Sequence, residues 1–254
     1  MMGNKIRIVA IIQARMSSSR LPNKVLMPLE GKPVLHHIIN RLKYCRTLDD
    51  IVVATSTDAS DDKIQEFCEA EHCLYFRGSL NDVLNRYYSA ALHYSADYIV
   101  RITADCPVID PVIVDTVVTS AVAEKYDLFS LGGSFPDGLD CSIFSKNALE
   151  KANQLAALKS EREHVGPFIE KNPTLFKIGN IELFKNLGHL RWTLDEKADY
   201  ELIQFIYQKL FQEEKLFLTN EILNLVEKYP QLLDLNSHII RNEGYIKSLK
   251  EDHI

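Results

Sequence analysis

The clearest chemical signal in the chain is a cationic loop near its start. The loop Gln13–Lys24 follows Ile6–Ala14, an apolar run with few charges, and contains three consecutive serines. Its cations are Arg15, Arg20 and Lys24. Small hydroxyl residues leave backbone N–H groups free to meet phosphate oxygens, and arginine and lysine neutralise phosphate charge. The loop therefore fits a phosphate-binding site, although a solvated basic loop has the same composition; the chain has no Walker A pattern.

Acidic residues follow two later apolar runs. Asp105 comes soon after the run at 98–103, and Asp195 ends Arg191–Asp195 and precedes a helical pattern. A carboxylate at the end of a buried strand can hold Mg²⁺, which usually takes one or two carboxylates together with phosphates and waters. We interpret Asp105 as a metal ligand and Asp110, beside Pro111, as a helix cap. Asp195 is open to either role, and Asp199 one turn later favours a helix N-terminus.

Alternating strands and helices must position these side chains. The first 130 residues predict strands near 6–14, 51–54, 73–76, 98–103 and 128–131, with helices between them. Such alternation predicts an α/β fold with a Rossmann-like, mostly parallel sheet and helices on both faces. Ligands bind beyond the carboxyl ends of the strands in these sheets, so three loops are expected to converge. They span 14–24, 77–82 and 103–110.

The chain changes character after residue 131. A turn-rich break at 132–138 precedes expected helices near 145–157, 160–171 and 197–211, and expected strands near 175–182 and 189–194. We interpret 132–190 as a small additional lobe on the substrate side of a domain spanning 1–213. Its nucleotide-binding half is about 1–131, and a strand and helix at 190–211 close it. Residues 214–254 predict a helical extension, near 219–228 and 236–250, without a chemical motif.

Composition limits the classes of partner. The net charge is −6, which disfavours a general nucleic-acid binder, although a small phosphate ligand needs only a local positive pocket. No apolar run approaches the ~18 residues of a membrane span, so no membrane partner is expected. The five cysteines form no C-x-x-C pair, which indicates reduced thiols in the cytoplasm and neither disulfides nor a zinc site.

Four ordered motifs, within residues 6 to about 211, resemble the acylneuraminate and 3-deoxy-manno-octulosonate cytidylyltransferases. Residues 13–24 with 28–33 resemble the opening signature, and Arg77–Tyr87 resembles the nucleotide-contacting segment. Arg101–Pro111 resembles the magnesium strand end, and Arg191–Asp195 with Asp199 resembles the final acidic motif. Segments 136–140 and 161–165 are similar to the spore coat polysaccharide biosynthesis branch of the family. The resemblance implies a nucleotide-diphospho-sugar transferase fold.

The resemblance also implies an activity and a site. The activity is transfer of CMP from CTP to a sugar with release of pyrophosphate and with Mg²⁺ as cofactor, and the sugar is a nonulosonic or related 2-keto-3-deoxy sugar acid. The implied catalytic residues are Arg15, Lys24 and Asp105, and the implied metal ligands are Asp105 and Asp195. The implied nucleotide contacts are Ala14, Arg15, Ser17, Arg20, Lys24, Arg77, Asp82 and Arg86. The implied sugar-side residues are Asp140, Glu163 and His164. A homodimer is also implied.

Some features keep other interpretations open. Ser142 stands where the spore coat branch often has an acidic residue, which leaves the sugar contacts open, and His164 could be a hydrogen-bonded structural residue. Another nucleotide on the same fold remains an alternative. A glycosyltransferase would be expected to show a D-x-D pair after a strand, which Asp105-Cys106-Pro107 lacks. A non-catalytic nucleotide-binding protein is disfavoured because Arg15, Lys24, Asp105 and Asp195 occur together.

Overall fold

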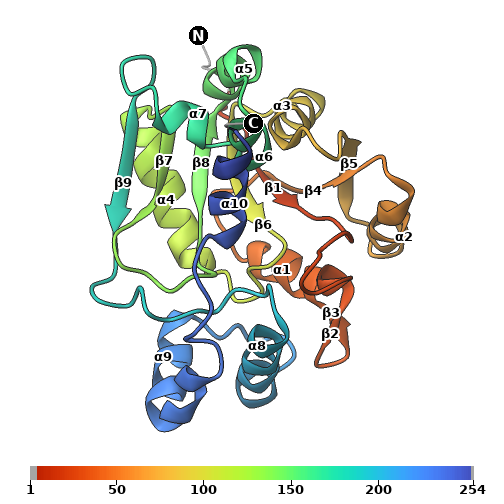
Figure 1. Ribbon diagram of the computed structural model, residues 1–254, viewed down its shortest axis with the longest axis vertical. Helices are drawn as coiled ribbons and strands as arrows, with labels where there is room; N and C mark the ends of the chain where they lie inside the picture. The colour runs from red at the N-terminus through yellow and green to blue at the C-terminus, as the bar shows by residue number, and fades with distance from the viewer. Residues whose placement is uncertain (1–4, 253–254) are drawn as a thin grey trace.

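A single seven-stranded sheet organises the chain (Figure 1). The computed structural model describes residues 5–252. The strand order is β5-β4-β1-β6-β8-β7-β9. Strands β1, β4, β5 and β6 are parallel, whereas β8 runs antiparallel to its neighbours β6 and β7. The bounds are β1 Ile8–Gln13, β4 Asp50–Ser56, β5 Leu74–Gly78, β6 Tyr98–Thr103, β7 Leu128–Gly132, β8 Ser142–Ser145 and β9 Ile178–Glu182.

Helices cover both faces of the sheet because its central strand is apolar on both. Val9 and Ile11 of β1 belong to one buried cluster, and Ala10 and Ile12 belong to the other. Successive side chains of a strand point to opposite faces, so this alternation requires a cover on each side. The helices α3 Val83–His93 and α5 Lys146–Leu155 cover the first face. The second is covered by α1 Val34–Leu42, α2 Asp62–Ala70, α4 Pro111–Glu124, α8 Lys197–Leu210 and α9 Thr219–Lys228. The predicted α/β class is confirmed.

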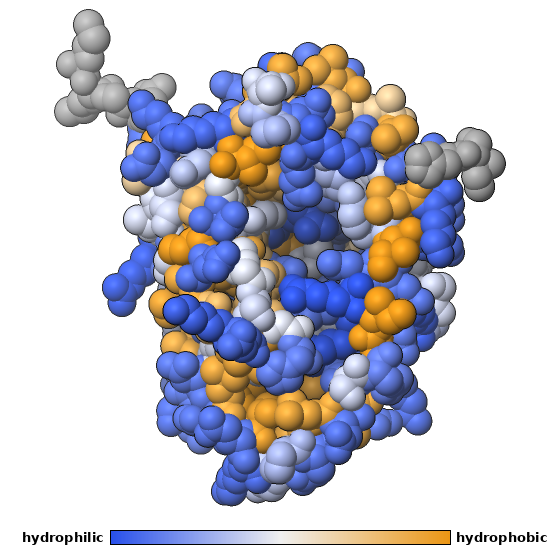
Figure 2. All heavy atoms as spheres, turned by 60° about the vertical axis from the view of Figure 1, so that its left-hand side comes forward, coloured by the Kyte–Doolittle hydropathy of each residue, from blue (hydrophilic) through white to orange (hydrophobic). Residues whose placement is uncertain are grey.

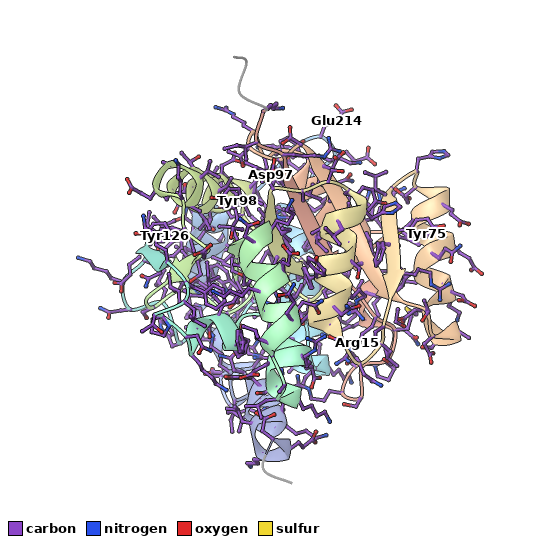
Figure 3. The ribbon with its side chains drawn as sticks, turned by 90° about the horizontal axis from the view of Figure 1, so that it is seen from above. Arg15, Tyr75, Asp97, Tyr98, Tyr126 and Glu214 are labelled. Atoms are coloured by element: carbon purple, nitrogen blue, oxygen red, sulfur yellow. The ribbon has the colours of Figure 1, made fainter. Side chains whose placement is uncertain are left out.

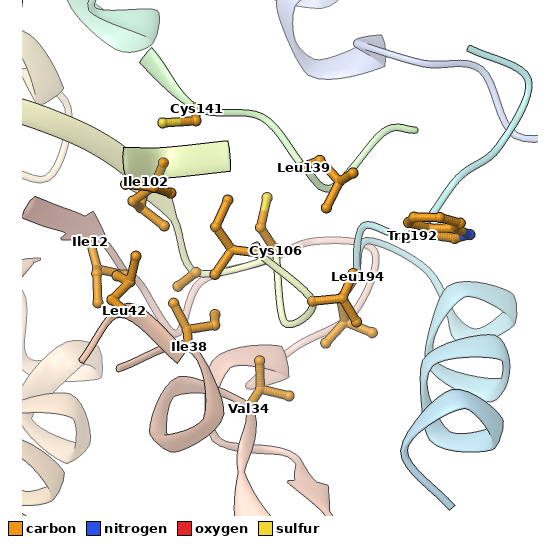
Figure 4. Packing of buried hydrophobic residues seen from close by; sticks show 14 of the residues in the cluster. Ile12, Val34, Ile38, Leu42, Ile102, Cys106, Leu139, Cys141, Trp192 and Leu194 are labelled. Carbon is orange, nitrogen blue, oxygen red and sulfur yellow. The ribbon is translucent and has the colours of Figure 1, made fainter. Parts of the chain in front are cut away.

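The core reaches up to the carboxyl ends of β1 and β6. Figure 4 shows Ile38 and Leu42 of α1 packed near Ile12 of β1 and Ile102 of β6, and all four are fully buried. Burying an aliphatic side chain of this size contributes about 1.5–3 kcal/mol. The strand ends that carry the cationic loop and Asp105 are therefore held by a close-packed layer.

Asp110 marks the start of α4, as its position beside Pro111 predicted. Its Oδ1 accepts the Val112 N–H at 2.9 Å, and Pro111 occupies the first turn. Its Oδ2 accepts the N–H and the hydroxyl of Thr219 at 3.0 and 2.7 Å. One buried carboxylate thus fixes the start of α4 and the start of α9 to each other.

The second half of the chain differs from the prediction in several places. Strands β8 and β9 of the expected lobe join the main sheet, and β8 had no counterpart among the predicted strands. The expected strand at 189–194 is wrong, since among the described residues only one bridge, between Asp137 and Arg191, forms there. The expected helix at 160–171 is two short helices, because Val165 has a φ of 70°. These are α6 Lys159–His164 and α7 Pro167–Glu170.

Smaller elements complete the described chain. A β2–β3 hairpin, Pro28–Leu29 and Lys32–Pro33, follows the 3-10 helix η1 Lys24–Leu26. The 3-10 helix η2 Ala59–Asp61 precedes α2 and is capped by Asp58. Asp61 occupies the N-cap position of α2, but its side chain forms no capping hydrogen bond there. After α9, η3 Pro230–Asp234 leads to α10 Glu243–Glu251, which begins later than the helix expected near 236–250. Within residues 5–252, none of the helices has the length and apolarity to cross a membrane.

Candidate active site

A cavity of about 720 Å³ opens beyond the carboxyl ends of β1 and β6. One face of the molecule is hollowed near its middle, and hydrophilic residues gather around the hollow (Figure 2). The cavity is lined by the loop after β1, the end of β6, Asp195, and parts of α6 and α10. Arg15 lies at the opposite end of the sheet from Asp97, which precedes β6 (Figure 3). The cavity therefore occupies the ligand-binding edge expected of a parallel sheet.

Lys24 joins the two acidic motifs at the floor of this cavity. Its Nζ lies 3.0 Å from Asp105 Oδ2 and 2.7 Å from Asp195 Oδ1. The Lys24 side chain is only 11% exposed, against 25% for Asp105 and 23% for Asp195. The structure therefore brings together three residues that are distant in sequence and that the motifs singled out.

The ion pairs decide the protonation of these groups. Burial alone would raise the pKa of Asp105, but the Lys24 charge, with hydrogen bonds from Thr103 and Lys24, outweighs burial and lowers the pKa to about 2. Burial would likewise lower the pKa of Lys24, yet the charges of Asp105 and Asp195 raise it. Both carboxylate and ammonium are therefore charged at neutral pH, as a phosphate- and cation-binding site requires.

The same carboxylates fit a hard divalent cation. Carboxylate oxygens are the donors that Mg²⁺ prefers, and the Lys24 ammonium lies between two of them, where positive charge is already stabilised. Among residues 5–252 no group of three His, Cys, Asp or Glu side chains is placed to hold a metal. Asp105 and Asp195 thus offer two protein ligands, and phosphate or water oxygens would supply the others.

A buried carboxylate holds the cationic loop in place. Asp61 is fully buried and accepts the N–H of Met16 at 2.7 Å and that of Ser56 at 3.2 Å. The loop then closes on itself, because Asn23 takes a left-handed conformation and donates its N–H to the Met16 carbonyl at 3.2 Å. No pattern in the sequence indicates this role for Asp61, because its partners are mostly backbone groups.

The two arginines of the cationic loop, Arg15 and Arg20, differ in their ion-pair partners. Arg15 and Ser17 line the cavity, and Arg15 forms no ion pair with any residue in the described part of the chain. Arg20 also lines it, but it already contacts three carboxylates. These are Asp195 at 3.0 Å, Glu196 at 3.6 Å and Glu243 of α10 at 2.7 Å. The loop is therefore joined to the C-terminal helix by Arg20.

Arg191 organises the final acidic motif. Its guanidinium is buried and binds Asp199 at 2.9 Å, Asp137 at 2.8 Å and Asp195 at 3.4 Å. Asp199 also accepts the backbone N–H groups of Asp195 and Glu196, each at 3.0 Å. Asp195 is thereby oriented through both its backbone and its side chain. Asp199 favours the start of α8, as expected, and in addition positions Asp195.

Four of the residues implied as nucleotide contacts do not line the cavity. Arg77 binds the Ser56 carbonyl at 2.7 Å and Asp62 at 2.8 Å, which fastens β5 to α2. Asp82 caps α3 by accepting the Asn85 N–H at 3.0 Å, and it pairs with Arg162. The other two are Arg86, which is fully buried and donates to the Ser79 carbonyl, and Ala14, which is buried and donates to the Ala54 carbonyl.

The implied sugar-side residues separate into two groups. Glu163 lines the cavity and accepts the Ser248 hydroxyl at 2.9 Å, and His164 Nε2 lies 3.0 Å from the same hydroxyl. Asp140 is not part of the cavity; it accepts the Gly138 N–H at 2.9 Å and lies 3.4 Å from Arg241. Burial lowers the pKa of His164, so it is neutral at pH 7 and serves as a hydrogen-bonding residue of the α6–α10 contact.

The cavity also contains residues that no motif indicated. They come from the chain's last helix and from the start of α6, where the sequence shows only an amphipathic pattern. Lysines spaced three apart on such a helix are the one signal that could have drawn attention to it. The residues are Lys159, Glu243, Gly244, Ile246, Lys247, Ser248, Lys250 and Glu251.

Comparison with known proteins assigns the chain to a family. A family model described as "Cytidylyltransferase" matches residues 9–239, which is most of the chain and includes both Lys24 and the two carboxylates that it binds. The chain belongs to the cytidylyltransferase family. The resemblance carried by the four motifs is thereby confirmed.

Three relatives of this cytidylyltransferase are similar to it over nearly their whole length. An uncharacterized protein of Methanocaldococcus jannaschii is 38% identical over 243 residues, covering 94% of this chain and 98% of that protein. The spore coat polysaccharide biosynthesis protein SpsF of Bacillus subtilis is 30% identical, covering 88% and 95%. The structure of a cytidylyltransferase from Leptospira borgpetersenii gives a TM-score of 0.85 at 32% identity, covering 90% of this chain and 97% of that one.

Proposed function

We propose that this cytidylyltransferase transfers CMP from CTP to a sugar, with release of pyrophosphate and with Mg²⁺ as cofactor. The observation that carries the proposal is the contact of Lys24 with Asp105 and Asp195 inside one cavity at the ligand-binding edge of the sheet. The acceptor is a nonulosonic or related 2-keto-3-deoxy sugar acid. The similarity to a spore coat polysaccharide biosynthesis protein supports a product used for surface polysaccharide.

Asp105 and Asp195 would hold the metal. When bound, Mg²⁺ supplies neutralising charge at the α-phosphate and lowers the pKa of the attacking hydroxyl. Arg191 and Asp199 keep Asp195 in place for this role through the contacts described above. Because Asp105 has a pKa of about 2, its carboxylate is available as a ligand throughout the neutral range.

The other cations act on the triphosphate. A bond forms between a sugar hydroxyl oxygen and the α-phosphorus, the hydroxyl proton passes to solvent, and the bond from that phosphorus to the oxygen of the departing pyrophosphate breaks. Such transfers depend on in-line positioning and charge stabilisation more than on covalent help from the protein. Lys24 and Arg15, both at the cavity wall, would offset the charge that accumulates on pyrophosphate. The small side chain of Ser17 leaves space for the phosphates beside Lys24 and Arg15.

A pyrophosphate-release assay with a panel of 2-keto-3-deoxy sugar acids tests the proposal. We expect release that requires CTP, Mg²⁺ and one class of acid together, with UTP, GTP and ATP at least about tenfold poorer. A melting-temperature screen of the four nucleotides with Mg²⁺ is the companion measurement, because a ligand that binds only the folded state raises the melting temperature.

Two results would contradict the proposal. Turnover with a finished nucleotide-sugar and a glycan acceptor, without pyrophosphate, would indicate a glycosyltransferase. Absence of any nucleotide effect on melting, together with absence of pyrophosphate release, would indicate a protein that uses this fold without the transferase chemistry.

A further inference from the structure

The C-terminal helix α10 docks beside the cavity through one face. In Figure 1 it lies next to α6, and its Ser248 hydroxyl contacts Glu163 and His164 of that helix. Ser248 is buried, and the Tyr245 ring meets the His164 ring edge-on with centroids 5.1 Å apart. Lys159 pairs with Glu251 at the far end of the helix. Contacts along the length of α10 thus fix its rotation about its own axis.

That rotation turns a second stripe of α10 towards the cavity. Residues three and four apart share one face of a helix, so Glu243, Lys247 and Lys250 form a stripe distinct from the docking face of Tyr245 and Ser248. All three line the cavity. The helix therefore presents a charged face to the same space that contains Lys24 and the metal-binding carboxylates.

Two of these charges are available to a ligand. Glu243 is engaged by Arg20, and Glu251 by Lys159. Lys247 and Lys250, by contrast, are exposed, and neither forms an ion pair with a residue within 5–252. The ammonium groups of Lys247 and Lys250 are therefore open to a ligand at the α10 side of the cavity.

The surroundings of these lysines favour a single carboxylate over a polyphosphate. Glu163 lines the same wall and, unlike Glu243 and Glu251, forms no ion pair with a residue within 5–252, so it would repel a group with several negative charges more than a single carboxylate. A sugar acid places one carboxylate among many hydroxyls, and those hydroxyls can donate to Glu163. Charge-assisted hydrogen bonds from ammonium groups are among the strong ones for a carboxylate.

We propose that α10 forms the acceptor-binding wall and that Lys247 and Lys250 bind the carboxylate of the sugar acid. The inference rests on the proposed function, which it deepens by assigning specificity to a helix outside the four motifs. The chain then supplies its acceptor recognition from its own C-terminal segment, and a neutral sugar of the same size is a poor substrate.

Steady-state kinetics of Lys247→Ala and Lys250→Ala test the proposal. Each hydrogen bond to a charged group is worth about 1.5–3 kcal/mol, so the KM for the sugar acid is expected to rise at least about tenfold in each variant. The KM for CTP and kcat are expected to stay within about twofold. Lys63→Ala, at an exposed position of α2 away from the cavity, is the matched control and leaves all three constants unchanged.

Any other outcome of these kinetics contradicts the inference. An unchanged acceptor KM in both variants, with normal CTP-dependent turnover, overturns the inference and leaves the proposed function standing. A raised KM for CTP with an unchanged acceptor KM places the lysines on the triphosphate and also overturns it. Absence of turnover by the unaltered protein with every sugar acid contradicts the proposed function and this inference together.

Discussion

At the scale of single residues, Lys24 is the centre of the site. In the structure its ammonium neutralises Asp105 and Asp195, the two groups proposed to bind the metal. A metal bound to these carboxylates would compete with the ammonium for their oxygens. Lys24 would then be released towards the phosphates, which is the direction in which its charge is needed during transfer.

Lys24→Ala is expected to lower kcat by at least ~10²-fold, in line with the loss of one donor to a transition-state charge. The measurement is pyrophosphate release at saturating CTP and acceptor. Far-ultraviolet circular dichroism of the variant controls for folding, because removing the ammonium leaves two carboxylates facing each other. A loss of only about twofold would show that Lys24 does not act on the reacting phosphates.

Asp105→Asn gives a prediction about pH. The folded-state pKa of Asp105 is about 2, below its ordinary value of 3.8, so the carboxylate stabilises the fold above that ordinary value. The contribution is about 2 kcal/mol and is lost as pH falls from about 4 towards 2. Urea unfolding of both proteins from pH 7 down to pH 3 is expected to show a difference that shrinks only below about pH 4. A difference that is constant through this range would contradict the assignment.

The motifs predicted the centre of the site but not all of its periphery. Asp105 follows the end of β6 and Lys24 belongs to the loop after β1, so the rule that such strand ends share one edge was enough to bring these two together. Asp195 follows a segment that is not a strand, and its bond to Lys24 is visible only in the structure. Arg77 and Asp82 are also near strand ends. Their ion-pair partners, Asp62 and Arg162, are distant in sequence and are recognisable only in three dimensions. Sequence position therefore predicts proximity to the edge, and folding decides which side chains turn into the cavity.

At the scale of elements, Asp110 connects two helices that are distant in sequence. Asp110→Ala removes the cap of α4 and leaves the buried N–H and hydroxyl of Thr219 without their acceptor. We expect the free energy of unfolding to fall by about 2 kcal/mol or more. Urea denaturation measures it, with Glu124→Ala at the exposed end of α4 as the control. Equal effects of the two substitutions would contradict the bridging role.

The errors in predicted elements have a common physical origin. Leu190, Trp192 and Leu194 alternate with polar residues and so resemble a strand, but they are buried by the core without strand partners. Gly138, at a φ of +103°, lies so close to this segment that a Cβ would come within 2.5 Å of the Trp192 backbone. Conversely, β8 is short and has polar ends at Ser142 and Ser145. Only its position between β6 and β7 makes it a strand.

At the scale of the whole molecule, both halves of the chain share one sheet. Strand β8, from the expected sugar-side lobe, pairs with β6 of the nucleotide half, and Phe144 packs in the same cluster as Val9 and Ile99. We expect calorimetry to show one unfolding transition with matching calorimetric and van't Hoff enthalpies. Two resolved transitions, with the first destabilised selectively by Phe144→Ala, would show that 132–190 is a separate unit.

The reversed direction of β8 has a consequence for how such enzymes diversify. Because β8 is antiparallel to β6, the chain leaves β8 at the end of the sheet far from the cavity. The following helices α5 and α6 lead the chain back to the cavity. The proposed phosphate chemistry depends on strand ends whose register cannot shift without disturbing the interior. The opposing wall depends on contacts between two surface helices. Under the proposed function, substitutions on α6 and α10 alone would therefore change the choice of sugar while leaving the residues around Lys24 unaltered.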